Sequence, residues 1–363
     1  MKIKKILHIT GVRDLGSGQR SQLIYESNAA RELKGVKWET LALHSGDIKE
    51  SFERKIPKCL DFILIRNIYF WMVISKLSKG YDVVLFRHLT FDPFSVIFTP
   101  FIKNRIGVHH SKEIEELRLI RKGFKGRLAS FVERITGRFA VKNSLYIAAV
   151  TEEIALYERK ERKIDKPILV YPNGVEVKKI KLLDDNRSTS TNILFICSHF
   201  AEWHGLDLLL ESVNRYKSEV KFFIHLIGNL TETQKLMIKN NKFSKNIIIY
   251  GSKNKEEYYN IASKCDVGLG SLAMYRQNLK EGSTLKVREM LAMGLPVYSG
   301  HKDASLDNGF KYYKYADDFE FEELLVFASN FKLVDRTMVR NEAESFIDKK
   351  GIMEKFIVDI NSL

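Results

Sequence analysis

The stretch 281-EGSTLKVREMLAMGLPVYSG-300 holds a short helix between a charged start and an apolar strand. Ser283 or Thr284 can cap this helix, Gly294 ends it, and Pro296 prevents its continuation before the strand begins. In an α/β domain such a helix points its N-terminus at the sheet edge where ligands bind. Free N–H groups and the helix dipole favour an anion there, so the stretch predicts a phosphate-binding helix N-terminus.

Charged side chains surround this predicted anion site. Lys286 and Arg288 could add positive charge. Glu281 and Glu289 can border the same pocket, where a carboxylate accepts two hydrogen bonds from hydroxyl groups of a ribose or another sugar. Taken alone, the spacing of the two glutamates equally fits a Glu289 that pairs with a nearby cation on a solvated helix face.

Strands and helices alternate in two series along the rest of the chain. The strand-like segments are continuously apolar or β-branched, as in a parallel sheet covered on both faces: 4–10, 38–45, 81–89, 104–110, 144–151, 191–198, 221–229, 246–252, 266–271 and 295–300. The helical segments are 20–35, 112–141, 205–217, 232–241, 255–265 and 283–293. Two series of this kind predict two doubly wound, Rossmann-like α/β domains. The turn signal in 171-YPNGVEV-177 marks their junction, which gives domains 1–173 and 174–337 and a C-terminal helix, 338–363, that packs back towards the first domain.

The composition of the 363 residues, with 45% hydrophobic and 29% charged side chains, is that of a soluble globular protein. Cys59, Cys197 and Cys265 form no metal-spaced pair, and their sparse, odd count indicates a reducing compartment. The apolar run at the N-terminus is too short for a signal peptide and fits a buried strand. We therefore expect a cytoplasmic location and no metal cluster.

The net charge of +14 lies almost entirely in the first half of the chain. Residues 1–175 contain 32 Lys and Arg against 19 Asp and Glu. Such a basic half predicts an anionic partner, namely membrane lipid, nucleic acid or a phosphate-bearing substrate, although a merely solvated surface is the simpler alternative. The apolar segment 62–75 is too short to span a bilayer and fits a buried core helix or an interfacial one. A basic cluster fits either a solvated face or contact with lipid head groups; it consists of Arg118, Arg121, Lys122, Lys125 and Arg127.

Several pieces, in this order, resemble GT-B fold glycosyltransferases of the retaining family 4 type, the glycosyl transferases group 1. The pieces are 16-GSG-18, 110-HSKEIEEL-117, 171-YPNGV-175, 203-WHGLDLLLES-212, 227-IG-228, 251-GS-252, 265-CDVGLGSL-272 and the opening stretch. The resemblance spans nearly the whole chain. It implies two Rossmann-like domains that face a central cleft, an acceptor-binding N-terminal domain and a nucleotide-sugar-binding C-terminal domain.

The resemblance also implies roles for single residues. Glu289 would bind the ribose hydroxyls of the donor, and Glu281 would lie near the transferred sugar. Backbone N–H groups of the segment Gly282, Ser283, Thr284 and Leu285 would face the sugar and the diphosphate. Gly18 would let the first loop approach the diphosphate or acceptor closely. His110 would reach the donor sugar from the N-terminal domain, unless it is a strand-end histidine with structural hydrogen bonds.

The segment 198-SHFAEWHGLD-207 departs from the family pattern. The family commonly has an arginine and a lysine that grip the diphosphate. This chain has Ser198 or His199 near the arginine's place and His204 in the lysine's. A neutral histidine is a poor replacement for a permanent cation. We expect Lys286, together with Arg276, to supply the missing charge, and a degenerate, non-catalytic protein stays an alternative.

The function that the resemblance implies is transfer of a sugar, with retention, from a UDP- or GDP-sugar to a lipid-linked or saccharide acceptor. Surface polysaccharide assembly, such as capsule or O-antigen synthesis, is the expected process, peripheral to the inner face of an anionic membrane. No cofactor, metal or dedicated protein base is expected. A nucleotide-sugar epimerase of the same fold is an alternative that leaves the basic half unexplained. A nucleic-acid binder is another alternative, although the chain carries no recognised motif for it.

Overall fold

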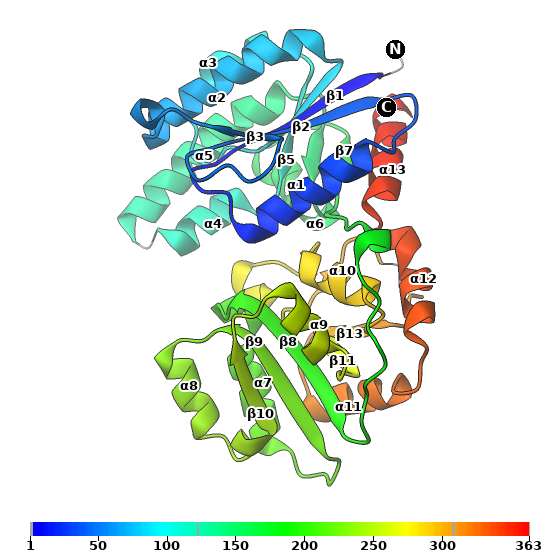
Figure 1. Cartoon of the computed structure of the whole chain (residues 1–363). Helices are drawn as coiled ribbons and strands as arrows, with labels where there is room; N and C mark the ends of the chain where they lie inside the picture. The colour runs from blue at the N-terminus through cyan, green and yellow to red at the C-terminus, as the bar shows by residue number, and fades with distance from the viewer. Residues whose placement is uncertain (1–2, 122, 307–308, 363) are drawn as a thin grey trace. The chain divides into compact units, whose positions relative to one another are not determined.

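The computed structural model describes residues 3–121, 123–306 and 309–362 (Figure 1). The chain divides into two compact units: unit 1 comprises Met1–Glu176 and Asp348–Leu363, and unit 2 comprises Val177–Ile347. The sequence predicted a boundary after residue 173 and one C-terminal helix. The structure has two helices there instead, α12 (Arg336–Ile347) in unit 2 and α13 (Lys349–Ser362) in unit 1.

Unit 1 is built on a parallel sheet. Within the described residues its strand order is β3-β2-β1-β4-β5-β6-β7, and every neighbouring pair is parallel. The strands are β1 (Lys5–Gly11), β2 (Lys37–His44), β3 (Glu53–Lys55), β4 (Val83–Arg87), β5 (Arg105–His109), β6 (Ile147–Ala149) and β7 (Ile168–Val170). The helices are α1 (Ser17–Ala30), α2 (Ile63–Leu77), α3 (Ser95–Phe98), α4 (Glu113–Ile120), α5 (Phe124–Lys142), α6 (Glu152–Glu161) and α13. The order reverses between β1 and β4, which makes this a doubly wound sheet.

The core of unit 1 explains the segment 62–75. Within α2, Phe70, Trp71 and Ile74 are buried against Phe86 and its neighbours in the sheet, so the core reading of this segment is confirmed for these side chains. A second set remains exposed, namely Phe62, Leu64, Ile65 and Met72. Among the described residues, each helix is too short or too polar to cross a membrane.

The helix α13 returns to unit 1 and packs against α1 and β7 (Figure 1). The buried Lys349 anchors its first turn, with Nζ 3.4 Å from Glu26 Oε2 and 3.9 Å from the ring centre of Tyr171. At the other end of the helix, the backbone N–H of Ile3 donates to Asn361 Oδ1 at 3.0 Å. Unit 1 is therefore completed by a segment from the far end of the sequence.

Unit 2 repeats the architecture. Its described strands follow the order β10-β9-β8-β11-β13-β15, again with parallel neighbours. The strands are β8 (Thr191–His199), β9 (Phe222–Asn229), β10 (Ile247–Gly251), β11 (Val267–Leu269), β13 (Val297–Ser299) and β15 (Tyr313–Tyr315), with a separate pair of β12 (Glu281–Gly282) and β14 (Lys302–Asp303). The helices are α7 (Leu206–Arg215), α8 (Glu232–Lys239), α9 (Lys255–Ala262), α10 (Leu285–Ala292), α11 (Phe321–Asn330) and α12. The order reverses between β8 and β11.

The predicted class, doubly wound α/β, is confirmed in both units, and the central cleft between them stays a prediction. The predicted helix over 112–141 is wrong as a single element. It is divided into α4 and α5, because Gly123 before α5 has a φ of +74°, a left-handed conformation that interrupts a helix. The predicted helix over 20–35 likewise ends earlier, at Ala30.

Candidate functional site

The candidate site in unit 2 lies where β8, β11 and β13 end, beside the reversal of strand order. The turn that holds Trp203 and His204 bonds to the segment after β11, since the N–H of Leu272 donates to the carbonyl oxygen of His204 at 3.0 Å. The segment after β13 bonds to the same place, because Gly300 N–H donates to Ser271 O at 3.0 Å. Loops from separate strands therefore converge at the edge where doubly wound sheets bind ligands.

Lys286 projects from the first turn of α10 towards the end of β8. Its Nζ lies 3.5 Å from Cys197 Sγ and 5.3 Å from the ring centre of Phe195. Burial lowers the pKa of Lys286, and the nearby Cys197 partly opposes this. Within residues 3–121, 123–306 and 309–362, no carboxylate lies within ion-pair distance of this ammonium group. The site thus holds a partly buried cation with no carboxylate partner among the described residues, an arrangement that a bound anion would stabilise.

His204 lies next to this cation and is neutral. Its Nδ1 accepts a hydrogen bond from the N–H of Ala201 at 3.0 Å, so the ring proton is on Nε2. Burial, with the charge of Lys286 and the nearby His199, lowers the pKa of His204 to about 3. Ser198 is exposed, with Oγ 3.3 Å from His199 Nδ1. Ser198 and His204 therefore offer hydrogen bonds at this edge and no permanent charge.

The residue at the N-cap of α10 does not cap the helix with its side chain. Thr284 occupies the capping position with extended backbone angles, but its side chain makes no capping hydrogen bond. Its Oγ1 is buried and finds no partner among the described residues. The expected capping bond is therefore missing, although the helix begins where predicted, at Leu285 after a buried Ser283. The first-turn N–H groups and Thr284 Oγ1 are polar groups that a bound anion can satisfy.

Gly282 packs against His301, a residue that the sequence did not mark as part of the site. A Cβ added at Gly282 would lie 2.5 Å from Cδ2 of His301, so the position excludes any larger residue without movement. His301 is fully buried, and burial lowers its pKa to about 4. Its Nδ1 lies 2.7 Å from Ser299 Oγ. No motif marks His301; its one signal is its place just after the predicted strand 295–300.

Two predicted cations of the site have other partners. Arg288 is buried, and its Nη2 lies 2.8 Å from Asp303 Oδ1 and 2.7 Å from Ser305 Oγ. It therefore ties α10 to β14, which pairs with the strand of Glu281, and adds no charge to the site. Arg276 binds Asp207 through two hydrogen bonds of 2.9 and 2.6 Å. Because these partners are distant in sequence, the sequence did not reveal them.

The two glutamates lie on separate elements of unit 2. Glu281 is partly exposed at the start of β12. In the register of the two parallel strands, it lies opposite Lys302 of β14. Glu289 is partly exposed on α10. Burial and the charge of Glu289 raise the pKa of Tyr259 on α9, which locates the carboxylate near that helix. That both glutamates border one pocket stays a prediction.

In unit 1, Gly18 lies in the first turn of α1, exposed, and a Cβ there would meet nothing within 4 Å. The fold itself therefore does not require a glycine at this position. His110 follows β5 and makes no hydrogen bond with the described residues. Burial lowers the pKa of His110 well below its usual value, and the nearby Arg87 adds to the effect. The alternative of a strand-end histidine with structural hydrogen bonds fits His109 instead.

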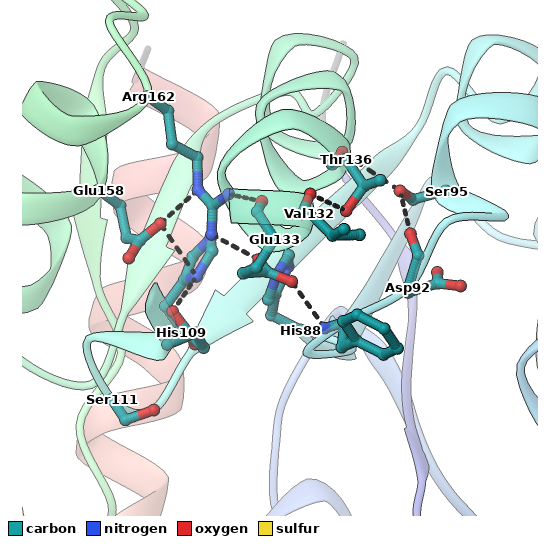
Figure 2. Close-up of polar contacts among 12 residues, drawn as sticks. His88, Asp92, Ser95, His109, Ser111, Val132, Glu133, Thr136, Glu158 and Arg162 are labelled. Carbon is teal, nitrogen blue, oxygen red and sulfur yellow. Dashed lines mark hydrogen bonds and ion pairs between the residues drawn. The ribbon is translucent and has the colours of Figure 1, made fainter. Parts of the chain in front are cut away.

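His109 belongs to a buried network that the sequence analysis missed (Figure 2). Arg162 contacts Glu158 and Glu133, the latter at 2.7 Å, while His109 Nδ1 lies 3.0 Å from Glu113. His109, Glu113 and Glu158 are close enough together to hold a metal ion, although the sequence predicted no metal cluster. Because the guanidinium of Arg162 already pairs with Glu158, we assign these groups to a buried polar network of unit 1 that is built around the Arg162 ion pairs.

Part of the chain is similar in sequence to known glycosyltransferases. Residues 179–303 match the sequence model described as glycosyl transferases group 1. An uncharacterized glycosyltransferase of Methanocaldococcus jannaschii is 24% identical over 175 residues, which are 45% of this chain and 44% of that protein. The chain thus matches less than half the length of this curated relative.

Solved structures match over nearly the whole chain. The lipopolysaccharide outer core galactosyltransferase WaaB has a TM-score of 0.67 at 12% identity and covers 99% of this chain and 100% of its own. HepE of Anabaena, solved in complex with UDP-glucose, has a TM-score of 0.65 at 11% identity, with 99% and 100% coverage. The chain therefore has the GT-B fold of these glycosyltransferases, and its second unit carries the segment similar to the glycosyl transferases group 1.

Proposed function

We propose that this chain is a glycosyltransferase that binds a nucleoside-diphosphate sugar at the carboxyl edge of the unit 2 sheet. The observation that carries the proposal is the partly buried ammonium of Lys286 beside the N-terminus of α10, where Thr284 Oγ1 has no partner among the described residues. Both features favour a diphosphate, since the helix dipole and the cation act on the same anion. The match of residues 179–303 to the group 1 model and the likeness to HepE, solved with UDP-glucose, support it.

In this proposal, different residues of unit 2 contact different parts of the donor. Lys286 supplies the positive charge that Ser198 and His204 lack, and His204 donates a hydrogen bond from Nε2. Gly282 to Leu285 offer backbone N–H groups, Glu289 binds the ribose and Glu281 lies near the sugar. Arg276 has no part in binding, because its charge is paired with Asp207.

The proposed reaction retains the configuration at the anomeric carbon. An acceptor hydroxyl forms the new C–O bond as the bond from that carbon to the β-phosphate oxygen breaks. The hydroxyl proton passes to the leaving phosphate on the same face of the sugar. Lys286 and the α10 dipole stabilise the charge that develops on the diphosphate, so the step requires no metal or cofactor.

The acceptor is assigned to unit 1, where Gly18 lets the first loop approach the diphosphate or the acceptor and His110 reaches the donor sugar. We propose a lipid-linked saccharide at an anionic membrane surface as that acceptor. UDP- and GDP-sugars are the donors to test, with UDP-glucose first because HepE was solved with it. Surface polysaccharide assembly on the inner face of the cell membrane is the proposed process.

The test is donor binding by calorimetry and release of nucleoside diphosphate, with Lys286→Met beside wild type. We expect Lys286→Met to weaken donor binding about 10- to 100-fold, the effect of one lost charge-assisted contact. Lys239→Met removes an exposed lysine of α8 and should leave binding unchanged. Equal binding by Lys286→Met would refute the assigned site. A wild-type protein that binds no UDP- or GDP-sugar would indicate a non-catalytic protein, and conversion of the donor without diphosphate release would indicate an epimerase.

A further inference from the structure

The helix α5 of unit 1 exposes its large apolar side chains. They recur at intervals of three or four residues, which places them on one helix face. This apolar stripe consists of Phe124, Leu128, Phe131, Ile135 and Phe139, which are 79%, 52%, 60%, 44% and 42% exposed. A surface helix ordinarily turns such a stripe towards the core, so α5 has the reverse arrangement.

The inward face of α5 leaves no room for a side chain at two of its positions. A Cβ on Gly126 would lie 1.7 Å from the carbonyl oxygen of Arg121, and one on Gly137 would lie 1.8 Å from Nη1 of Arg162. Most of the rest of that face is small or polar, with Ala129, Ser130, Thr136 and Ala140 buried beside Val141. Close packing therefore fixes which residues of α5 face inward.

Glu133 fixes the rotation of the helix. Its carboxylate is fully buried and lies 2.7 Å from Arg162 Nη2 and 2.9 Å from His88 Nε2, and it accepts the N–H of Phe91 at 2.6 Å (Figure 2). Turning the apolar stripe inward would expel this carboxylate from three polar partners. The exposure of the stripe is therefore a property of the fold, and a contiguous apolar surface of this kind marks an interaction site.

The charges beside the stripe select the partner. The exposed cations of α5 are Lys125, Arg127, Arg134, Arg138 and Lys142, and the single acid in its sequence is the buried Glu133. Arg134 pairs with Glu161, while Arg127 and Arg138 have no carboxylate partner among the described residues. A second copy of the helix would bring like charges together, so the pattern disfavours self-association. Apolar side chains flanked by Lys and Arg suit an anionic lipid surface.

A hollow of about 520 Å³ adjoins the stripe. Its lining is apolar except for two cations and consists of Phe91, Arg121, Lys125, Leu128 and Ala129. The guanidinium of Arg121 lies over the ring of Phe91 at 5.0 Å from its centre. These cations belong to the basic cluster of the sequence; Lys122 of that cluster lies outside the described residues. An apolar lining that includes two cations suits the phosphate head group and upper chain of a lipid.

We propose that α5 docks unit 1 on an anionic bilayer, with the helix axis in the interfacial plane and the apolar stripe among the lipid chains. The 19 residues of α5 give a contact about 28 Å long. The docking itself is independent of catalysis; its purpose, delivery of the transfer site to a lipid-linked acceptor, rests on the proposed function. The segment 62–75 is then chiefly a core helix.

The experiment is co-sedimentation of the full chain with phosphatidylcholine vesicles, with and without phosphatidylglycerol. We expect binding only with phosphatidylglycerol, weakened by added salt. The double variant Leu128→Ser, Phe131→Ser should lower the affinity about tenfold or more, because both side chains leave the lipid. Arg127→Gln, Arg138→Gln should also weaken binding. The matched control is Leu236→Ser, Val326→Ser, which changes exposed apolar residues of unit 2 and should bind as wild type does.

UDP-glucose binding, measured on the same proteins, separates the two proposals. The stripe variants should bind UDP-glucose as wild type does, which also shows that they are folded. Vesicle binding without UDP-glucose binding would support the docking surface and refute the proposed donor. Equal vesicle binding by wild type and the stripe variant would overturn the docking surface. So would binding to a DNA oligonucleotide in place of vesicles, or a dimer that the stripe variant dissociates.

Discussion

Gly282 is a single residue with no space for a side chain, because His301 lies against it. We expect Gly282→Ala to destabilise the protein by about 1–3 kcal/mol, because its Cβ would force His301 to move in a packed interior. Donor binding should weaken as well, since the backbone N–H groups of this segment are assigned to the donor. Chemical denaturation and calorimetry would measure the two effects.

The matched control for that variant is Gly351→Ala. Gly351 lies on α13, and a Cβ there would meet nothing within 4 Å. Alanine should therefore stabilise the helix by about 0.5–1 kcal/mol. If Gly282→Ala were as stable as wild type, the contact between Gly282 and His301 would not constrain the site.

The protonation of His204 predicts the pH dependence of donor binding. Its pKa of about 3 means that the ring stays neutral throughout the range in which a free histidine titrates. Because a nucleotide-sugar diphosphate also keeps its charge there, UDP-glucose affinity should show no step from His204 near pH 6.5. A step that disappears in His204→Gln would contradict the assignment of a neutral donor at this position.

At the scale of elements, the orientation of α5 depends on its buried ion pair. We expect Glu133→Gln to destabilise the protein by about 3 kcal/mol, because Arg162 would lose part of its compensating charge in the interior. Urea denaturation measures this loss. Arg134→Gln, on the next residue of the same helix, removes a half-exposed pair with Glu161 and should cost about 0.5 kcal/mol or less. Equal losses from the two variants would count against a special role of the buried pair.

The sequence predicted those elements whose pattern is strong and local. Continuously apolar runs such as 191–198 and 221–229 became central strands of unit 2, since only a strand covered on both faces needs such runs. The strand β3, Glu53–Lys55, was missed because three polar residues carry no such pattern. The break at Gly123 was missed because the helical period continues through it, and only the backbone conformation reveals it.

The candidate site could be predicted only in part for the same reason. Motifs placed Gly282, Thr284 and Lys286 on one segment, and that segment does begin α10 beside the end of β8. What the motifs could not supply were long-range partners. Asp303 pairs with Arg288 and Asp207 pairs with Arg276. His301 packs against Gly282. A charged residue in a motif has no assigned role until its ion-pair partner is known.

For the whole molecule, buried neutral histidines predict acid sensitivity. Burial lowers the pKa of His109, His225 and His301 to about 4 in each case, against an ordinary value of 6.5. As pH falls from 6.5 towards 4, the unfolded chain takes up protons that the folded protein does not, so stability falls. Each histidine contributes on the order of 1–3 kcal/mol to this loss.

Thermal denaturation between pH 7 and pH 4.5 checks this prediction, and the melting temperature should decrease steadily. The net charge of +14 also favours acid unfolding by general repulsion. A series at high salt screens that repulsion and should retain most of the decrease. A melting temperature that stays constant at high salt would show that the histidines do not control it.

The return of α13 to unit 1 has a practical consequence for dissecting the protein. Unit 2 is one continuous segment, Val177–Ile347, whereas unit 1 is split, so truncation after Glu176 would remove Lys349 from Glu26 and Tyr171. Because Ile3 bonds to Asn361, a short glycine linker could join residue 363 to residue 1. A circular permutant opened between Glu176 and Val177 would make each unit contiguous and leave a single covalent crossing at Ile347. Each half could then be produced, labelled and titrated as an independent fragment.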